Sequence, residues 1–448
     1  MSRTKDMTVG SPTKRILTFA LPLLLTNIGQ QLYMIVDASI VGRGIGVKAL
    51  AAVGATDWTY WVVLWTITTM TQGFATFVSR YFGEKDYEKM NQAVAGSIWL
   101  SAAVSVVLTV LGLLLSRPVL LMLKTPGDIL DDSVVYLTTM IGGSLAVAGY
   151  NITAAILRAL GDGKSPMIAM VIAAVLNIGL DLLTVFVFRW GVFGAAIASV
   201  ASQLIAFLYC LRRILKTEFI RLDKEAIRPN FSMMKELLAF GLPLALQYVV
   251  INASGMVLQS TINLQGSIFV AGYTANNKVY GLLECSAISL GFSATTFFSQ
   301  NYGAKKMDRL RAGMRSTIAI GIGMAVVIGA VMVGFGQQLL SLFIDQTEVG
   351  SGQALEIAYR YLTTMSCCLI ILYLIYAYRS ALQSMGSSIP SMISGFTECG
   401  ARILVAKGLY AWLGQTCLFF AEPIAWLGSL FWIMGSYYVL RTRYMKEA

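Results

Sequence analysis

The stretch that decides the fold occurs twice. "FALPLLL" at residues 19–25 returns as "FGLPLAL" at residues 240–246, an offset of 221 positions. Each copy lies within a long apolar run and carries a proline, which removes a backbone hydrogen-bond donor and is expected to kink a helix. Such kinks are tolerated in membrane helices. The repeat therefore predicts two copies of one helical half.

Two further blocks support the duplication. "SRYFGEK" at residues 79–85 matches "SQNYGAK" at 299–305, and "LRALGDGKSP" at 157–166 matches "LQSMGSSIP" at 382–390. Three blocks in one order, at nearly constant spacing, indicate an internal repeat. With an even number of spans in each half, both halves start on the same side of the membrane. Transporters use such parallel repeats as two lobes that rock about a central site.

The composition indicates a membrane protein. Of 448 residues, 56% are hydrophobic and 13% are charged, whereas soluble proteins average about 25% charged residues. The mean hydropathy is +0.69. The predicted fold is an all-α polytopic membrane protein with twelve transmembrane helices in two pseudo-symmetric six-helix lobes. We place the spans, each about 20 residues or longer, at 16–41, 57–79, 92–116, 133–157, 166–188, 191–211, 237–263, 279–299, 314–335, 356–379, 391–411 and 416–440.

These spans divide the chain into five parts. We expect a cytoplasmic tail at 1–15, an N-terminal lobe at 16–211, a cytoplasmic linker at 212–236, a C-terminal lobe at 237–440 and a cytoplasmic tail at 441–448. The linker alternates apolar and charged residues, a pattern typical of an amphipathic segment on a membrane surface.

The excess of basic residues sets the topology. The net charge is +11, and seven Lys and Arg residues fall within 212–235. Basic residues gather in the alternate connections that would be cytoplasmic, and we count Arg379 among them. The positive-inside rule then predicts a multi-pass protein of the cell (inner or plasma) membrane with both termini in the cytoplasm. This distribution argues against a nucleic-acid partner.

The residue inventory argues against an enzyme. The chain has no histidine, and we find no nucleophile–base pair, HExxH motif or P-loop. We therefore expect no catalytic residue, no cofactor and no ATP hydrolysis. The cysteines lack metal-ligand spacing and are interpreted as small buried hydrophobic residues: Cys210, Cys285, Cys367, Cys368, Cys399 and Cys417.

One carboxylate, Asp37, lies within the first span. An acid at the centre of a span costs about 2.5–3.5 kcal/mol, and such residues usually face a cavity or a partner. Gln30, Tyr33 and Asp37 share one helical face, which predicts a polar stripe lining a cavity. The alternative is that Asp37 only ends the helix near the outer interface, because Gly42 follows shortly after.

The fifth span supplies a partner for that acid. Asn177 and Asp181 are four residues apart in "NIGLD" and share a face. We expect Asp181 and Asp37 to converge, with Asn151 of the fourth span and Ser199 of the sixth adding neutral oxygens. Two carboxylates in a low-dielectric site cannot both carry charge cheaply. The pair would therefore hold either a proton or Na⁺, the only metal we expect, and the residues do not choose between them.

The second half differs at this point. The position matching Asp37 is Leu258, and no acid occurs between Gly241 and Gln265. The seventh span carries a neutral polar stripe instead, which is interpreted as either cavity lining or interhelical hydrogen bonding. Its members are Tyr248, Asn252, Gln259 and Asn263.

Three other acids lie in or beside the spans of the second half. Glu398 is four residues before Arg402, which predicts a structural ion pair. Glu284, early in the eighth span, is a candidate to face the cavity and attract a cationic substrate. Glu422 is expected near an interface.

Taken together, these stretches resemble the multidrug and toxic compound extrusion (MATE) family, within the multidrug/oligosaccharidyl-lipid/polysaccharide exporter superfamily. The matching segments are "ALPLLLTNIGQQLYMIVDASIVG", "FGEKDYEKMNQA", "LRALGDGKSPM", "LNIGLDLLTVF" and "GVFGAAIAS". The resemblance implies twelve helices in a V-shaped pair of lobes, and places a cation or proton site at Asp37, Asn177 and Asp181, with Asn151 and Ser199 beside it. Some branches also carry coupling acids in the seventh span, and this chain does not.

The leading hypothesis is a secondary active multidrug efflux transporter. It would export amphiphilic, cationic organic compounds by alternating access, in antiport with H⁺ or Na⁺. We expect it to act as a monomer among membrane lipids. The alternative is a lipid-linked precursor flippase of the same superfamily, which would favour fourteen spans and a strongly basic central cavity.

Overall fold

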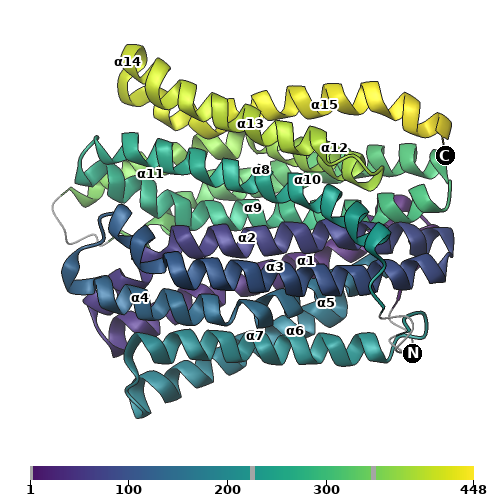
Figure 1. The fold of residues 1–448 in the computed structure, drawn as a ribbon. Helices are drawn as coiled ribbons and strands as arrows, with labels where there is room; N and C mark the ends of the chain where they lie inside the picture. Colours follow the sequence, from purple (N-terminus) through teal and green to yellow (C-terminus); the bar gives the residue numbers. More distant parts are fainter. Residues whose placement is uncertain (1–3, 222–227, 345–349, 448) are drawn as a thin grey trace. The chain divides into compact units, whose positions relative to one another are not determined.

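The computed structural model describes residues 4–221, 228–344 and 350–447. Across these ranges the secondary structure is helical, with no β-strand (Figure 1). The chain divides into two compact units, which we call the first and second lobe. The first lobe comprises Met1–Met7 and Leu25–Ala245, and the second comprises Thr8–Leu24 and Leu246–Ala448.

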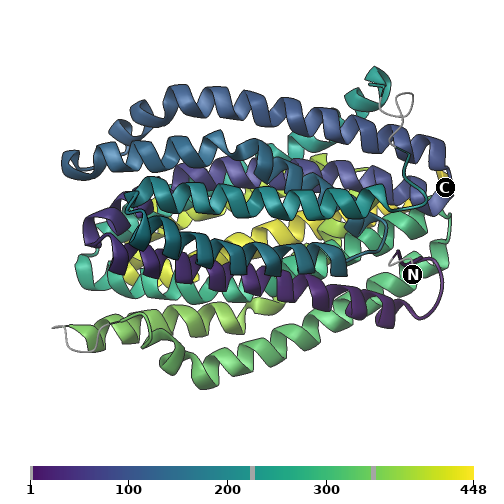
Figure 2. The same cartoon turned by 90° about the horizontal axis from the view of Figure 1, so that it is seen from below.

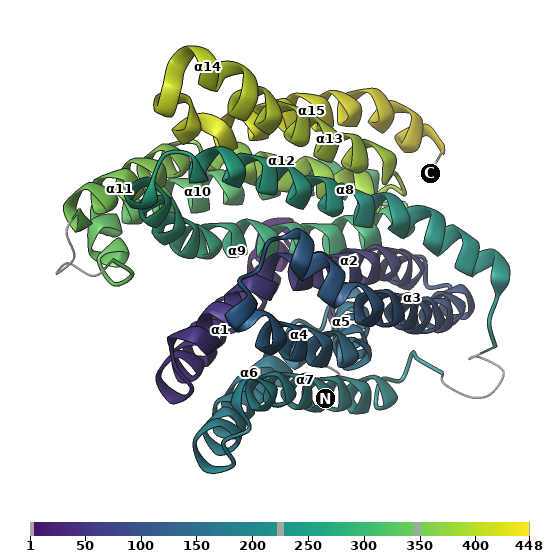
Figure 3. The ribbon, with the colours of Figure 1, turned by 60° about the vertical axis from the view of Figure 1, so that its left-hand side comes forward.

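The first lobe contains most of α1 and the helices that follow it. In this lobe α6 packs on α7, and α2 packs on both α3 and α5 (Figure 3). A π-helical turn, η1 (Leu182–Val187), continues α6. The helices are α1 (Pro12–Gly44), α2 (Val47–Glu84), α3 (Tyr87–Met122), α4 (Gly127–Gly142), α5 (Ser144–Ala159), α6 (Lys164–Asp181) and α7 (Gly191–Leu215).

The second lobe has the same order of elements. Here α13 packs on α15, and α9 packs on α11 and α12; the helices within each lobe run roughly parallel to one another (Figures 1 and 2). The elements are α8 (Phe231–Asn263), α9 (Ser267–Gly303), α10 (Met307–Leu340), α11 (Ser351–Cys367), α12 (Leu369–Ser384), α13 (Ile389–Ile403), the π-helical η2 (Leu404–Leu409), α14 (Tyr410–Leu413), the 3-10 helix η3 (Gly414–Phe420) and α15 (Ala421–Glu447).

The backbone repeats its irregularities between the lobes. Left-handed residues follow α2 and α9 at equivalent places, with φ of 61° at Lys85 and 56° at Lys305. The π-helical turns begin at Leu182 and Leu404, an offset of 222 positions. Because these features depend on backbone conformation rather than on composition, they confirm the internal repeat independently of the sequence matches.

Two predicted spans are bent rather than continuous. The span expected at 133–157 is broken between α4 and α5 by 43°, and the span at 356–379 is broken between α11 and α12 by 48°. Glycine marks the first break, since a Cβ on Gly143 would lie 2.2 Å from Cγ2 of Val200. No glycine or proline marks the second break, which lies at Cys368.

The described helices account for six spans in each lobe. By length and composition, eight helices could cross a membrane, or up to ten if each bent pair is one span. One of the eight is the 54-residue stretch Ile389–Thr442, which turns back on itself because α13 packs along α15. The 38-residue α2 is long enough to cross a membrane but is not among these eight.

The outer surfaces of these helices are apolar. Leu114, Val175, Phe335 and Val439 are each more than 60% exposed. Soluble proteins rarely expose so much contiguous apolar surface. A membrane environment removes that cost, as the composition predicts.

Some local expectations need correction or stay open. Arg379 does not lie in a cytoplasmic connection but is buried within α12. The predicted tail at 441–448 continues α15 as far as Glu447. Cys367 is exposed rather than buried. Pro22 and Pro243 lie inside α1 and α8, and the kink expected at each stays a prediction.

The linker is only partly described, because residues 222–227 lie outside the described ranges. Its first part contacts the first lobe. Phe219 stacks on Tyr87 with ring centroids 5.1 Å apart, and the side chain of Asn91 donates a hydrogen bond to the Phe219 carbonyl over 3.2 Å. These contacts hold the start of the linker against the beginning of α3.

Candidate functional site

The buried polar site of the first lobe is built where α6 changes to a π-helical turn. Asp181 is the last residue of α6, and Asn177 lies one turn earlier on the same face. Both side chains are fully buried, and Asp37 on α1 is 9% exposed. A π-turn widens the helix locally and is frequent at functional sites. Here it directly follows the buried carboxylate.

Four predicted residues meet Asp181 at this place. The Asp37 and Asp181 carboxyl groups lie near enough to interact electrostatically. The Asn177 amide donates a hydrogen bond to Oγ of Ser199 over 3.2 Å. The Tyr33 hydroxyl lies near Ser199 and both carboxylates. The fold thus brings these residues near one another, and their role in binding an ion stays a prediction.

Several oxygens of this cluster have no hydrogen-bond donor. Among the described residues, no partner reaches Oδ1 of Asp37, Oδ1 of Asn177 or either carboxylate oxygen of Asp181. Leaving such groups buried and unsatisfied is costly. Oxygen-only ligands suit a proton shared between carboxyls or a hard cation such as Na⁺. No group of three or more His, Cys, Asp and Glu residues forms a metal site in the described part of the chain.

The other two residues expected in this lobe make no hydrogen bond with that cluster among the described residues. Asn151 on α5 accepts a hydrogen bond from Oγ1 of Thr68 over 3.2 Å and donates one to the Val147 carbonyl over 2.9 Å. Its amide is thus engaged with α2 and with its own helix. Gln30 is half-buried on α1, one turn before Tyr33.

Two tyrosines beside Asp37 were not anticipated. Tyr60 on α2 interacts with Tyr33, and Tyr136 on α4 interacts with both Asp37 and Tyr33. Each lies among other polar residues of its own helix, such as Asp57 near Tyr60 and Thr138 near Tyr136. The position of either tyrosine along its helix does not show that it faces the interior of the first lobe.

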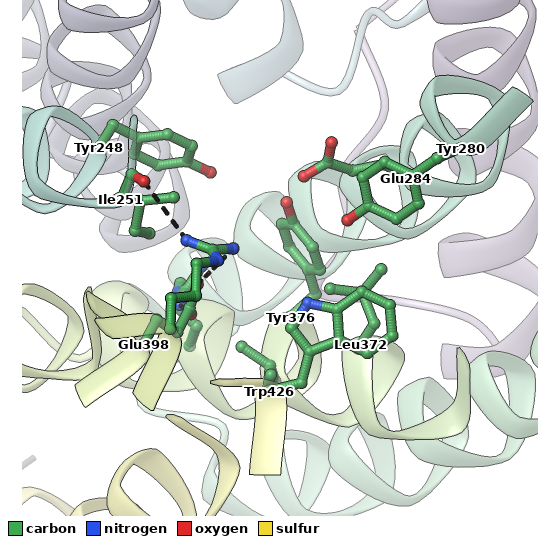
Figure 4. A pocket seen from close by; sticks show the side chains of 11 residues that line it. Tyr248, Ile251, Tyr280, Glu284, Leu372, Tyr376, Glu398 and Trp426 are labelled. Carbon is green, nitrogen blue, oxygen red and sulfur yellow. Dashed lines mark hydrogen bonds and ion pairs between the residues drawn. The ribbon is translucent and has the colours of Figure 1, made fainter. Parts of the chain in front are cut away.

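The second lobe contains a cavity of about 40 Å³ (Figure 4). Two of the predicted residues, Tyr248 and Glu284, lie in its wall, and the rest of the wall comes from α8, α9, α12, α13 and α15. The full lining is Tyr248, Ile251, Tyr280, Glu284, Leu372, Ile375, Tyr376, Arg379, Glu398, Arg402 and Trp426.

A network of buried ion pairs borders this cavity. Arg379 binds Glu398 over 3.1 Å, and Arg402 lies 3.9 Å from Glu398, the predicted i,i+4 partner. The closer partner of Arg402 is Glu422, bound through two contacts of 3.1 and 2.7 Å. The start of α15 brings Glu422 to Arg402, and the expectation that Glu422 lies near an interface stays a prediction.

The polar stripe of α8 is divided between different surroundings. Tyr248 lines the cavity. The Asn252 amide donates to the Tyr248 carbonyl over 2.8 Å, within the helix. Gln259 donates to Oδ1 of Asn263 over 2.8 Å at the end of α8, where Asn263 is exposed. Only Tyr248 of this stripe therefore reaches the cavity wall.

Comparison with known proteins identifies the family. The MatE family model matches residues 22–183 and 243–406, one copy in each half of the chain. The chain is 29% identical over 343 residues to the probable multidrug resistance protein YpnP of Bacillus subtilis, which covers 77% of each protein. It is 28% identical to the probable multidrug resistance protein YoeA of the same organism, over 94% of this chain and 92% of the relative.

A solved structure shows the same fold. The outward-facing conformation of a multidrug resistance MATE family transporter matches with a TM-score of 0.88 and 22% identity, covering 100% of both chains. A duplicated fold is indicated by the two matched segments, by the repeated backbone irregularities and by the two six-helix lobes. The chain belongs to the MatE family of multidrug and toxic compound extrusion transporters.

Proposed function

We propose that this protein exports amphiphilic organic cations by alternating access, driven by inward movement of a proton through the Asp37–Asp181 pair. The observation that carries the proposal is the buried carboxyl pair with unsatisfied oxygens. One shared proton would satisfy part of that demand and remove one charge from a low-dielectric site. The similarity to probable multidrug resistance proteins supports the substrate class.

The ligand set favours a proton over Na⁺. A Na⁺ ion would need several oxygens around the two carboxylates. Asn151, which was expected to supply one, is held by Thr68 and Val147. Ser199 receives the Asn177 amide. The neutral oxygens that remain are few, whereas two interacting carboxyl groups are sufficient to hold a proton.

The energy available is adequate for modest accumulation. Exchanging one proton for one monovalent cation moves no net charge, so the pH difference across the membrane drives it, at about 1.4 kcal/mol per pH unit. Loading the pair from the outside and unloading it inward would couple that energy to export of one cationic substrate. The first lobe carries this coupling in the proposal, because the matching position in the second half is Leu258.

The test uses purified protein in liposomes. Efflux of a fluorescent organic cation is followed under a pH gradient alone and then under a Na⁺ gradient alone. We expect transport with the pH gradient, and expect Asp37→Asn and Asp181→Asn each to abolish it while leaving the protein folded. The control is Asp131→Asn, which changes an acid whose side chain is 82% exposed. Normal efflux by a well-expressed Asp37→Asn variant would refute the coupling site, and transport under Na⁺ alone would replace the proton with Na⁺.

We also propose a monomer in the cell membrane with both termini in the cytoplasm. The support is the concentration of basic residues in the connections on that side, including the seven within 212–235. Reporter fusions at the two termini test it, and a periplasmic or extracellular signal from either fusion would contradict it.

A further inference from the structure

Glu284 is the one carboxylate of the second-lobe cavity that lacks a partner among the described residues. It forms no ion pair or hydrogen bond with them and is half-buried in the cavity wall. The two arginines beside it are already bound, Arg379 to Glu398 over 3.1 Å and Arg402 to Glu422 over 2.7 Å. Two guanidinium groups face three carboxylates, so the ionised cluster carries one net negative charge. A cation in the cavity would balance it.

The groups around that charge favour a ligand with N–H donors. Figure 4 shows the Glu284 carboxyl and the hydroxyls of Tyr248, Tyr280 and Tyr376 pointing into the same space. Tyr280 also stacks on Trp426 with ring centroids 6.2 Å apart, which makes one wall aromatic. Carboxylate and phenol oxygens accept hydrogen bonds from a protonated amine. A quaternary ammonium has no N–H to donate.

The size of the cavity limits what can enter. Its volume is about 40 Å³, and a water molecule needs about 10–15 Å³ on the same measure. The space therefore admits roughly three water-sized groups. An ammonium group with its first methylene fits, whereas an aromatic ring system does not.

From these features we infer that the cavity binds the protonated amine head group of the exported amphiphile and selects protonated amines over quaternary ammonium compounds. Glu284 supplies the counter-charge, and the tyrosine hydroxyls supply further acceptors. The inference rests on the proposed function for the identity of the ligand as a transported cation. It does not depend on the coupling site, because binding is measured without any gradient.

The test compares two probes that differ only at the head group. One is a dansyl fluorophore on a five-carbon chain ending in a primary amine, and the other is its trimethylammonium analogue. Binding of each to the full chain in lipid nanodiscs is measured by fluorescence at one pH and one salt concentration. A charge-assisted hydrogen bond is worth about 10- to 100-fold in affinity. We expect the wild type to prefer the amine by at least about 10-fold.

Glu284→Gln should remove that preference, and Tyr376→Phe should reduce it. The matched control is Glu356→Gln, which alters an exposed acid on α11 of the same lobe and should leave the preference unchanged. Glu284→Gln takes away a charge without an ion-pair partner, so its melting temperature should equal or exceed that of the wild type. If it does not fold, Glu284→Asp and Tyr376→Phe carry the test.

Equal binding of both probes by the wild type, or an unchanged preference in the Glu284 variants, would overturn the inference. An altered response to Na⁺ in place of an altered amine preference would also overturn it, by making Glu284 an ion site. The Asp37→Asn variant separates the two proposals. Retained amine preference without transport supports the cavity assignment, whereas transport by that variant defeats only the proposed coupling site.

Discussion

Replacing Arg402 by methionine should destabilise the second lobe severely. The guanidinium is 7% exposed and makes four short contacts. Two go to Glu422, one goes to Oγ of Ser254 over 2.8 Å, and one goes to the Ile251 carbonyl over 3.3 Å. Methionine keeps much of the volume but donates to none of these acceptors. Breaking a buried ion pair by removing one partner costs about 3–5 kcal/mol.

The structure places the expected loss near the lower end of that range. Glu398 keeps Arg379 at 3.1 Å, and the Glu422 side chain is 17% exposed and can recruit water. Glu422→Gln alone should cost less, because Arg402 retains Glu398 and Ser254. In the double variant no unpaired Glu422 charge remains. We therefore expect it to lose at least about 1.5 kcal/mol less than the sum of the single losses.

Thermal unfolding in detergent, followed with a thiol-reactive dye, measures these effects. Cys210, Cys285 and Cys417 are free and buried, so their labelling reports loss of structure. At about 2–4 °C per kcal/mol for a unit of this size, Arg402→Met should lower the melting temperature by about 6–12 °C. The control Arg117→Met breaks an exposed pair with Asp131 at 3.1 Å and should cost under about 1 kcal/mol.

Two results would refute this reasoning about the network. A melting temperature for Arg402→Met within about 2 °C of the wild type would show that the buried pairs contribute little. Fully additive losses in the double variant would show that Arg402 and Glu422 do not interact energetically, whatever their separation.

Two further predictions concern the connections between helices. Asp86 caps α3 by accepting the Lys89 backbone N–H over 3.0 Å, which holds the pKa of Asp86 below its usual value. Asp86→Ala should cost about 1 kcal/mol of stability near neutral pH. The difference in melting temperature between this variant and the wild type should shrink as the pH falls below about 4, because the carboxylate then protonates and the cap is lost. An equal difference at pH 3 would contradict the cap. Gly161 has a φ of +81°, and a Cβ there would lie 2.2 Å from the Lys5 carbonyl oxygen. Gly161→Ala should therefore lower the melting temperature, whereas Gly323→Ala, whose Cβ meets nothing within 4 Å, should not; equal effects would refute the steric argument.

The duplicated membrane fold could be predicted because its signals are local. The hydropathy of each segment indicates directly that it lies in the membrane. The two copies of the proline block, at residues 19–25 and 240–246, show the repeat from the sequence alone. The bend at Gly143 has a glycine to indicate it. The equivalent bend at Cys368 has no such residue, so only the packing of its helices reveals it.

The candidate sites show the same difference between signals within one helix and contacts between helices. Asn177 and Asp181 share a helix, so their four-residue spacing placed them on one face, and the fold brings Asp181 near Asp37. A contact between two helices leaves no regular spacing in the sequence that could predict it. Asn151 was expected to add an oxygen to the site of Asp37 and Asp181, yet its side chain bonds to Thr68 and to the Val147 carbonyl.

Arg379 shows why tertiary structure decides the chemistry of the second lobe. In the sequence it is one basic residue near the end of a span, the kind that topology rules assign to the cytoplasm. In the fold it is buried and bound to Glu398, on a helix reached only after a turn. The sequence by itself determined which residues must leave water, because that depends on each segment's own polarity. Which buried charges would meet depended on how the helices pack, and so did the lack of a partner for Glu284 among the described residues. Charges 19 residues or more apart along the chain become neighbours only through the fold.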